Sequence, residues 1–306
     1  MNEPFSTTIA ENDAVSMENV CFSREGQTVL ENVSFSLKNG EFMAILGPNG
    51  GGKTTLLKIM LGLFTPGRGA VRVFGASPEK MRASIGYVPQ FSTIRQEFPA
   101  TVLDMAMMGA ASQDKTGFFG PAKLWGTNRD DKNKALGVLE KIGIADLAKS
   151  PIHALSGGQR QRLLVARALM GRKGTEPFLL LLDEPTASID PEGKGCFFEF
   201  LDNLRGDVTM VIVSHELGMI SPFFDHVALV NTTLSINPGP CADTDVMRAF
   251  IGLHSPNCPV ESILRHSPGC GCDSPHTGGY ATQAVSIQMN PTPESSTPEN
   301  SIERNV

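Results

Sequence analysis

The chain has 306 residues, of which 41% are hydrophobic and 19% charged, so its length allows one large domain or two small ones. Its formal net charge of -6 argues against a general nucleic-acid-binding protein, which would usually carry a basic surface, and we expect no nucleic-acid partner. No stretch approaches the ~20 consecutive apolar residues that cross a bilayer. Residues 1–16 lack the basic and apolar regions of a signal peptide.

Composition divides the chain into three parts. Apolar runs separated by Gly and Pro indicate a packed domain over residues 15–238, preceded by a flexible N-terminus over 1–14. Residues 239–306 turn toward Pro, Cys and His and then toward Ser, Thr, Asn and Glu, which predicts a largely disordered tail. The six cysteines form no disulfide framework, which favours a reducing cytoplasm.

Within the domain, strand-like runs alternate with helical patterns. Residues 29–37 alternate apolar and polar side chains, as a half-exposed antiparallel strand would. Buried strands are predicted over 42–46, 178–182 and 210–213, and helices over 54–63, 130–142 and 159–170. This alternation predicts an α/β fold with a mostly parallel core sheet.

The segment after the first buried strand is the strongest chemical signal. It reads Gly47-Pro-Asn-Gly-Gly-Gly-Lys-Thr54 and fits G-x-x-x-x-G-K-[ST] between a strand and a helix. Glycines let backbone N–H groups approach phosphate oxygens, and the helix adds its positive end. We expect Lys53 to reach the β- and γ-phosphates and the Thr54 hydroxyl to bind Mg²⁺. The candidate phosphate-binding residues are Gly47, Pro48, Asn49, Gly50, Gly51, Gly52, Lys53, Thr54 and Thr55.

A pair of carboxylates follows the buried strand at 178–182. Because ligands of open α/β sheets bind at the carboxyl ends of the strands, Asp183 is a candidate Mg²⁺ ligand. Glu184 is the candidate catalytic residue that orients or deprotonates the attacking water. With the phosphate-binding loop, the pair predicts hydrolysis of a bound nucleotide with Mg²⁺; the family resemblance described next implies that the nucleotide is ATP.

Several further motifs resemble those of ABC transporter ATPases. Leu155-Ser-Gly-Gly-Gln159 resembles the family's signature, and Gln90, Ala187–Asp190 and His215 resemble its Q-loop, D-loop and switch histidine. Taken alone, His215 is more often structural and Gln90 an ordinary loop amide. The resemblance implies a P-loop NTPase with a mixed or parallel core sheet, an antiparallel β subdomain and a helical subdomain over about 91–155.

The resemblance also implies roles for individual residues. His215 would contact the γ-phosphate, and Gln90 would contribute to Mg²⁺ binding and to coupling. Nucleotide contacts are implied for Ser156, Gly157, Gly158, Gln159 and Asp190. In the family, two ATP molecules are sandwiched in a head-to-tail dimer, so we expect a homodimer. The family's adenine-stacking aromatic residue is replaced here by Arg24, unless Phe22 takes its place.

The transported substrate rests on weaker signals. Residues 98–102, Asp104, Met108-Gly109 and residues 117–120 resemble the zinc and manganese importer branch. That branch implies integral membrane permease subunits as partners, an extracytoplasmic substrate-binding protein acting indirectly, and a peripheral location on the cytoplasmic face of the membrane. The alternatives are an ATPase for iron-chelate, haem or other substrates, and a soluble ABC ATPase outside transport.

The tail carries six potential zinc ligands. These are His254, Cys258, His266, Cys270, Cys272 and His276. The Cys270-Gly-Cys272 spacing is tighter than the usual C-x₂₋₄-C. The tail is therefore either a loose metal-binding segment or a chain with incidental ligands.

Overall fold

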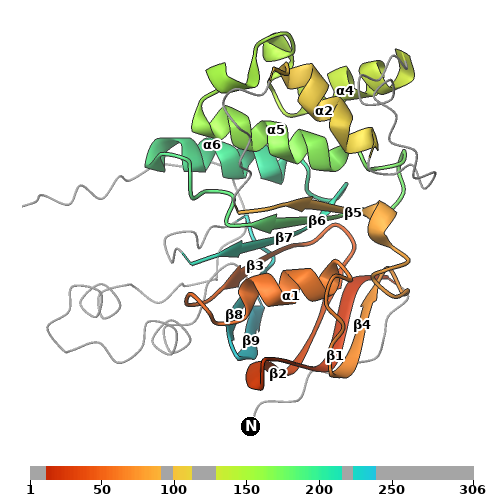
Figure 1. Ribbon diagram of the computed structural model, residues 1–306, viewed down its shortest axis with the longest axis vertical. Coiled ribbons are helices and arrows are strands. Elements are labelled where there is room, and N and C mark those ends of the chain that lie inside the picture. Colours follow the sequence, from red (N-terminus) through yellow and green to blue (C-terminus); the bar gives the residue numbers. More distant parts are fainter. Residues whose placement is uncertain (1–11, 91–98, 112–128, 216–222, 239–306) are drawn as a thin grey trace, which may run out of the picture. The chain divides into compact units, whose positions relative to one another are not determined.

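The computed structural model describes residues 12–90, 99–111, 129–215 and 223–238 (Figure 1). The tail over 239–306 with its Cys and His residues, residue 98 and residues 117–120 lie outside the described residues, so those expectations stay predictions. In the described ranges no helix has both the length and the apolar character needed to cross a membrane.

A three-stranded antiparallel sheet has the order β2-β1-β4. It consists of β1 (Asp13–Arg24), β2 (Gln27–Lys38) and β4 (Arg68–Val73). Leu30, Val33, Phe35 and Leu37 of β2 are buried while intervening residues are exposed, which confirms the predicted half-exposed strand.

The six-stranded sheet has the order β5-β6-β7-β3-β8-β9, and only its β8–β9 pair is antiparallel. Its strands are β3 (Phe42–Leu46), β5 (Ile85–Val88), β6 (Leu179–Asp183), β7 (Thr209–Ser214), β8 (His226–Asn231) and β9 (Thr233–Pro238). Every residue of β3, β6 and β7 is buried, because the sheet is covered on both faces. The predicted α/β fold with a mostly parallel core is confirmed.

Helices cover the two faces of the large sheet differently (Figure 1). α1 (Lys53–Met60) lies on the face toward the small sheet, whereas α5 (Gly157–Leu169) and α6 (Pro191–Asp202) lie on the other. α2 (Val102–Ala111) and α4 (Arg129–Lys141) pack beyond α5. Three short 3₁₀ helices lie in the connections: η1 (Arg82–Ser84) precedes β5, and η2 (Ala145–Leu147) and η3 (Ile152–Ala154) lie between α4 and α5. α2 approaches α5 closely, since a Cβ on Gly109 would lie 1.9 Å from Arg167 O.

The hydrophobic core is divided in two by the large sheet. Phe42, Ala44 and Leu46 of β3 point into the cluster beneath α5 and α6. Met43 and Ile45 point into the cluster that contains α1 and the small sheet. The period-two alternation of a strand thus places one continuous apolar run in both cores.

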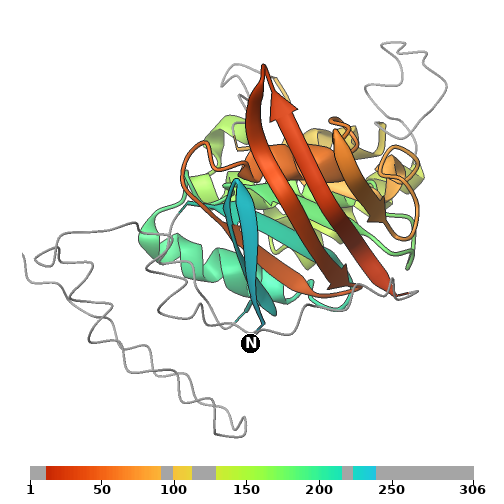
Figure 2. The same cartoon turned by 90° about the horizontal axis from the view of Figure 1, so that it is seen from below.

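The small sheet also touches the far end of the large sheet. Figure 2 shows the β8–β9 hairpin beside β2, and Glu31 N donates a hydrogen bond to Thr232 O there (2.8 Å). Thr232 N in turn donates to Gly51 O (3.1 Å). The hairpin therefore supports the loop that follows β3.

Strand register places the ends of four parallel strands at one edge of the sheet. Leu46 pairs with Ser214, and Asp183 pairs with Val213. Val88 pairs with Leu182 on the outer side of β6. The segments that follow β3, β5, β6 and β7 consequently emerge together, and we refer to this side as the carboxyl edge.

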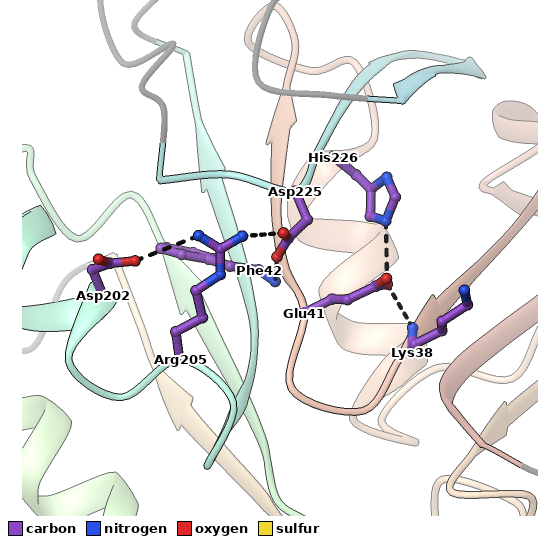
Figure 3. A network of polar contacts seen from close by, with 7 residues as sticks. All are labelled: Lys38, Glu41, Phe42, Asp202, Arg205, Asp225 and His226. Carbon is purple, nitrogen blue, oxygen red and sulfur yellow. Dashed lines mark hydrogen bonds and ion pairs between the residues drawn. The ribbon is translucent and has the colours of Figure 1, made fainter. Parts of the chain in front are cut away.

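The opposite side, the amino edge, carries two polar groups (Figure 3). In the first, Glu41 Oε2 accepts a hydrogen bond from Lys38 N (2.8 Å) and lies 3.1 Å from His226 Nε2. Glu41 directly precedes β3, and His226 is the first residue of β8. Glu41 thus links the starts of two adjacent strands.

The second group at the amino edge centres on Asp225. Its Oδ2 accepts a hydrogen bond from Phe42 N (2.9 Å), and its Oδ1 forms an ion pair with Arg205 (Figure 3). Arg205 also lies 3.6 Å from Asp202 Oδ1 at the end of α6. The guanidinium therefore joins α6 to the start of the large sheet.

Candidate functional site

The loop between β3 and α1 lies at the carboxyl edge and is shaped by its glycines. Gly50 and Gly52 have positive φ values of 81° and 101°, which L side chains rarely adopt. A Cβ on Gly47 would lie 2.2 Å from Val230 O and one on Gly51 2.9 Å from the same oxygen. The loop therefore packs so closely against β8 that side chains would collide with it at these two positions. Pro48, Asn49 and Gly50 are exposed at its tip.

Lys53 begins α1 and reaches back over this loop. Its Nζ donates hydrogen bonds to Gly47 O (2.8 Å) and Pro48 O (2.9 Å). Burial lowers the pKa of Lys53, and the charges of Glu184 and Asp183 oppose that shift. The Lys53 cation thus lies at the N-terminus of α1, and both the charge and the helix end favour an anion there.

Asp183 is the last residue of β6, and only 2% of it is exposed. Thr54 Oγ1 donates to its Oδ1 (3.3 Å), and Tyr87 Oη donates to its Oδ2 (3.4 Å). Burial is the largest cause that raises the pKa of Asp183, with Glu184 adding to it and the two hydrogen bonds opposing it. Thr54 and Asp183 supply adjacent hard oxygen donors, which fit Mg²⁺. Thr55 follows on the first turn of α1.

Tyr87 is the residue of this site that the sequence reasoning missed. It lies on β5 and pairs with Leu181 of β6, two residues before Asp183. Burial raises the pKa of Tyr87 to about 12, so the phenol keeps its proton and can donate. Its position three residues before Gln90 was the available signal, but the adjacency of β5 and β6 was needed to use it.

Glu184 is held between two side chains from neighbouring segments. Gln90 Nε2 donates to its Oε2, and His215 Nδ1 lies 2.9 Å from its Oε1. Glu184 itself has φ 47°, a left-handed conformation uncommon outside glycine, and its N–H donates to Val213 O (2.8 Å). His215 is 43% exposed, whereas Glu184 is buried, so the histidine covers the carboxylate on the solvent side. The three candidate catalytic residues are thus brought together.

The predicted signature residues form the start of α5. Ser156 is the N-cap: its Oγ accepts from Gln159 N (3.3 Å), and Gln159 Oε1 accepts from Ser156 N (3.0 Å). A Cβ on Gly157 would lie 2.2 Å from Ser188 O, so the signature packs directly on the segment after the acidic pair. The first N–H groups of a helix lack intrahelical acceptors, which makes this a second anion-binding terminus.

Ser156 and Asp190 are the N-caps of α5 and α6, and these two helices lie on the side of the large sheet opposite α1 (Figure 1). Asp190 caps α6 by accepting a hydrogen bond from Gly193 N (2.6 Å). Gly158 follows Gly157 in the first turn of α5. The segment that ends at Asp190 thus packs beside the signature, where a Cβ on Gly158 would lie 4.0 Å from the Ile189 side chain.

The two candidates for adenine stacking differ in their surroundings. Phe22 stacks on Phe64, with ring centroids 5.2 Å apart and an interplanar angle of 6°. The Arg24 side chain is 66% exposed and lies 3.6 Å from Glu25. Phe22 has one ring face covered, whereas Arg24 is open to solvent, and the choice between them stays a prediction.

Residues 30–187 match the protein family described as ABC transporter. The chain is 40% identical over 75% of its length to the "probable metal transport system ATP-binding protein" of Chlamydia pneumoniae, covering 83% of that protein. It is 36% identical over 70% of its length to the high-affinity zinc uptake system ATP-binding protein ZnuC of Bacillus subtilis, covering 89% of it. Among solved structures, cbiO1 of Clostridium perfringens, part of the ABC transporter complex cbiONQ, shows 27% identity and a TM-score of 0.63, with 75% of this chain and 89% of that chain covered.

Proposed function

We propose that this chain, which belongs to the ABC transporter family, is the ATP-hydrolysing subunit of an importer for a divalent metal ion, zinc or manganese. The observation that carries the ATPase part is the meeting of the phosphate-binding loop with Asp183 and Glu184 at the carboxyl edge, where Thr54 Oγ1 lies 3.3 Å from Asp183 Oδ1. The metal part is supported by the names of the relatives.

The loop residues would bind the triphosphate of ATP. Lys53 exchanges hydrogen bonds to Gly47 O and Pro48 O for bonds to phosphate oxygens, so its buried charge keeps polar partners. Thr54 and Asp183, with Gln90, would hold Mg²⁺, which neutralises phosphate charge when bound. The chain would thus supply a cation to the phosphates and oxygen ligands to the Mg²⁺ ion.

Glu184 would act on the attacking water. Gln90 and His215 contact different oxygens of its carboxylate and so hold its orientation. A carboxylate fixed in this way can orient a water molecule and accept its proton. His215 is also exposed enough to reach a phosphate beyond Glu184.

The signature residues would serve the nucleotide of a second copy of this chain. Within one chain, α1 and α5 present two anion-binding N-termini on opposite faces of the large sheet (Figure 1). A head-to-tail homodimer would place each signature against the partner's nucleotide. Hydrolysis would then require both subunits.

We place the ATPase domain at residues 15–238, with a helical subdomain over about 91–155 that receives integral membrane permease subunits. The chain would bind at the cytoplasmic face of the membrane as a peripheral subunit. An extracytoplasmic substrate-binding protein would take part indirectly. The Cys- and His-containing tail over 239–306 stays outside this proposal.

The test is reconstitution of the full chain with its permease subunits in liposomes. We expect ATP-dependent accumulation of zinc or manganese, together with ATP hydrolysis measured as phosphate release. Lys53→Ala is the matched control, because losing a charged hydrogen-bonding group should lower ATP affinity by about tenfold or more. Uptake of an iron chelate or haem instead of a metal ion would transfer the chain to the alternative substrate class.

A further inference from the structure

Tyr87 connects the strand that carries Gln90 to the acidic pair. Its side chain is half-buried on β5, and its phenol donates to Asp183 Oδ2 at 3.4 Å. Three residues later, Gln90 Nε2 donates to Glu184 Oε2. The β5 segment therefore contacts both carboxylates, each through one neutral donor.

The two oxygens of Asp183 have different partners. Oδ1 accepts from Thr54, the candidate Mg²⁺ ligand on α1, and Oδ2 accepts from Tyr87 on β5. Two donors from different elements define the plane of a carboxylate, whose last torsion otherwise has only a broad, two-fold preference. Without the Tyr87 hydroxyl, Oδ2 would lose this hydrogen bond, and the Asp183 carboxylate could turn away from Thr54.

We propose that Tyr87 is a positioning residue for Mg²⁺-dependent nucleotide binding, which holds Asp183 so that Oδ1 stays directed at Thr54. This inference rests on the proposed function, since it assumes that Thr54 and Asp183 bind the metal of a nucleotide complex. The competing explanation is that the Tyr87 ring only fills space beside Ile85, which lies two residues earlier and in the same core cluster.

The variant Tyr87→Phe separates these explanations because it keeps the ring and removes the hydroxyl. The full chain also carries Glu184→Gln, so that bound ATP is not consumed. Binding of a fluorescent ATP analogue is titrated against Mg²⁺ and repeated in EDTA. We expect the half-saturating Mg²⁺ concentration to rise about tenfold, as loss of a hydrogen bond to a charged group predicts. Affinity in EDTA should change less than about twofold.

Ile85→Val is the matched control in the same background. It trims one methylene from the same face of β5 and alters no polar group. We expect its Mg²⁺ titration to equal that of the parent. Thermal unfolding without nucleotide should show that both variants fold, and excess Mg²⁺ should restore nucleotide binding to the Tyr87→Phe chain.

Two results would overturn the inference while leaving the proposed function in place. One is a Tyr87→Phe chain whose Mg²⁺ titration equals that of the parent. The other is an equal loss of affinity with Mg²⁺ and in EDTA, which would indicate damage to the loop as a whole. A parent chain that binds no nucleotide at all would instead overturn the proposed function, and the inference with it.

Discussion

The two edges of the large sheet both carry buried or half-buried carboxylates, but the negative charges of these carboxylates are balanced by different partners at each edge. At the amino edge, Asp225 pairs with the guanidinium of Arg205 and accepts a backbone hydrogen bond from Phe42. At the carboxyl edge, Asp183 and Glu184 are adjacent in sequence, and burial raises the pKa of Asp183.

The donors at the two edges explain this difference. Asp183 accepts from two hydroxyl groups, which carry no charge, whereas Asp225 meets a full positive charge. Lys53, which lies near both acids of the carboxyl edge, directs its hydrogen bonds to loop carbonyls. The amino edge is therefore arranged for stability. Under the proposed function, the carboxyl edge keeps negative charge available for a bound cation, at some cost in stability.

The largest effect is expected from Glu184→Gln at the carboxyl edge. Because the amide cannot accept a proton from water, ATP turnover should fall by about 10²–10⁴-fold. ATP binding should persist, since the phosphate-binding loop is untouched, and the chain should collect as an ATP-bound dimer. Phosphate release and light scattering would measure the two effects. Rapid residual hydrolysis would refute the role given to Glu184.

The next largest effect should come from the amino edge and concern stability alone. Asp225→Ala leaves Phe42 N and Arg205 without their shared acceptor, which should lower the free energy of unfolding by about 2–3 kcal/mol. Urea unfolding measures the loss, and ATP affinity should be unchanged. Asp146→Ala, at an exposed position on η2, is the control with an expected change within about 0.5 kcal/mol. A loss of ATP binding in Asp225→Ala would contradict the assignment of the amino edge to stability alone.

How far the sequence predicted the molecule depends on how local each feature is. The strand over 42–46 was predicted residue for residue, because a short apolar run ending at glycine is a local signal. The first helix was predicted to reach Leu63 but ends at Met60. Gly62 adopts a left-handed φ of 64°, which ends the helix, and Leu63 beyond it is exposed. The prediction was wrong here because the apolar spacing continues past this glycine.

The site shows the same dependence. The phosphate-binding loop and the acidic pair are contiguous motifs, so their residues could be named from the sequence. The contact of Tyr87 with Asp183 joins residues 96 positions apart and exists only because β5 pairs with β6. No periodicity or spacing encodes that strand order, which is decided by how the connecting helices pack on the sheet.

A smaller effect of opposite sign is expected from Asp183→Asn. The amide removes a charge whose ionised form is disfavoured by burial, as the raised pKa of Asp183 indicates, so the nucleotide-free chain should become more stable by about 1 kcal/mol. Added Mg²⁺ and ATP should raise the melting temperature of the parent chain but not that of the variant. Differential scanning calorimetry with and without ligand measures both. Destabilisation of the nucleotide-free chain would show that Asp183 contributes to the fold as Asp225 does.

The smallest effect should come from the first polar group of the amino edge, which contains Glu41 and His226. His226 and Glu41 are each about one-quarter exposed and their atoms lie 3.1 Å apart, so solvent screens their interaction. A double-mutant cycle with His226→Ala and Glu41→Ala should give a coupling energy of about 0.2–1 kcal/mol by urea unfolding. Glu41→Ala alone should cost more than His226→Ala, because it also removes the acceptor of Lys38 N. A coupling energy as large as the stability loss in Asp225→Ala would show that solvent exposure does not decide which of the two contacts contributes more to stability.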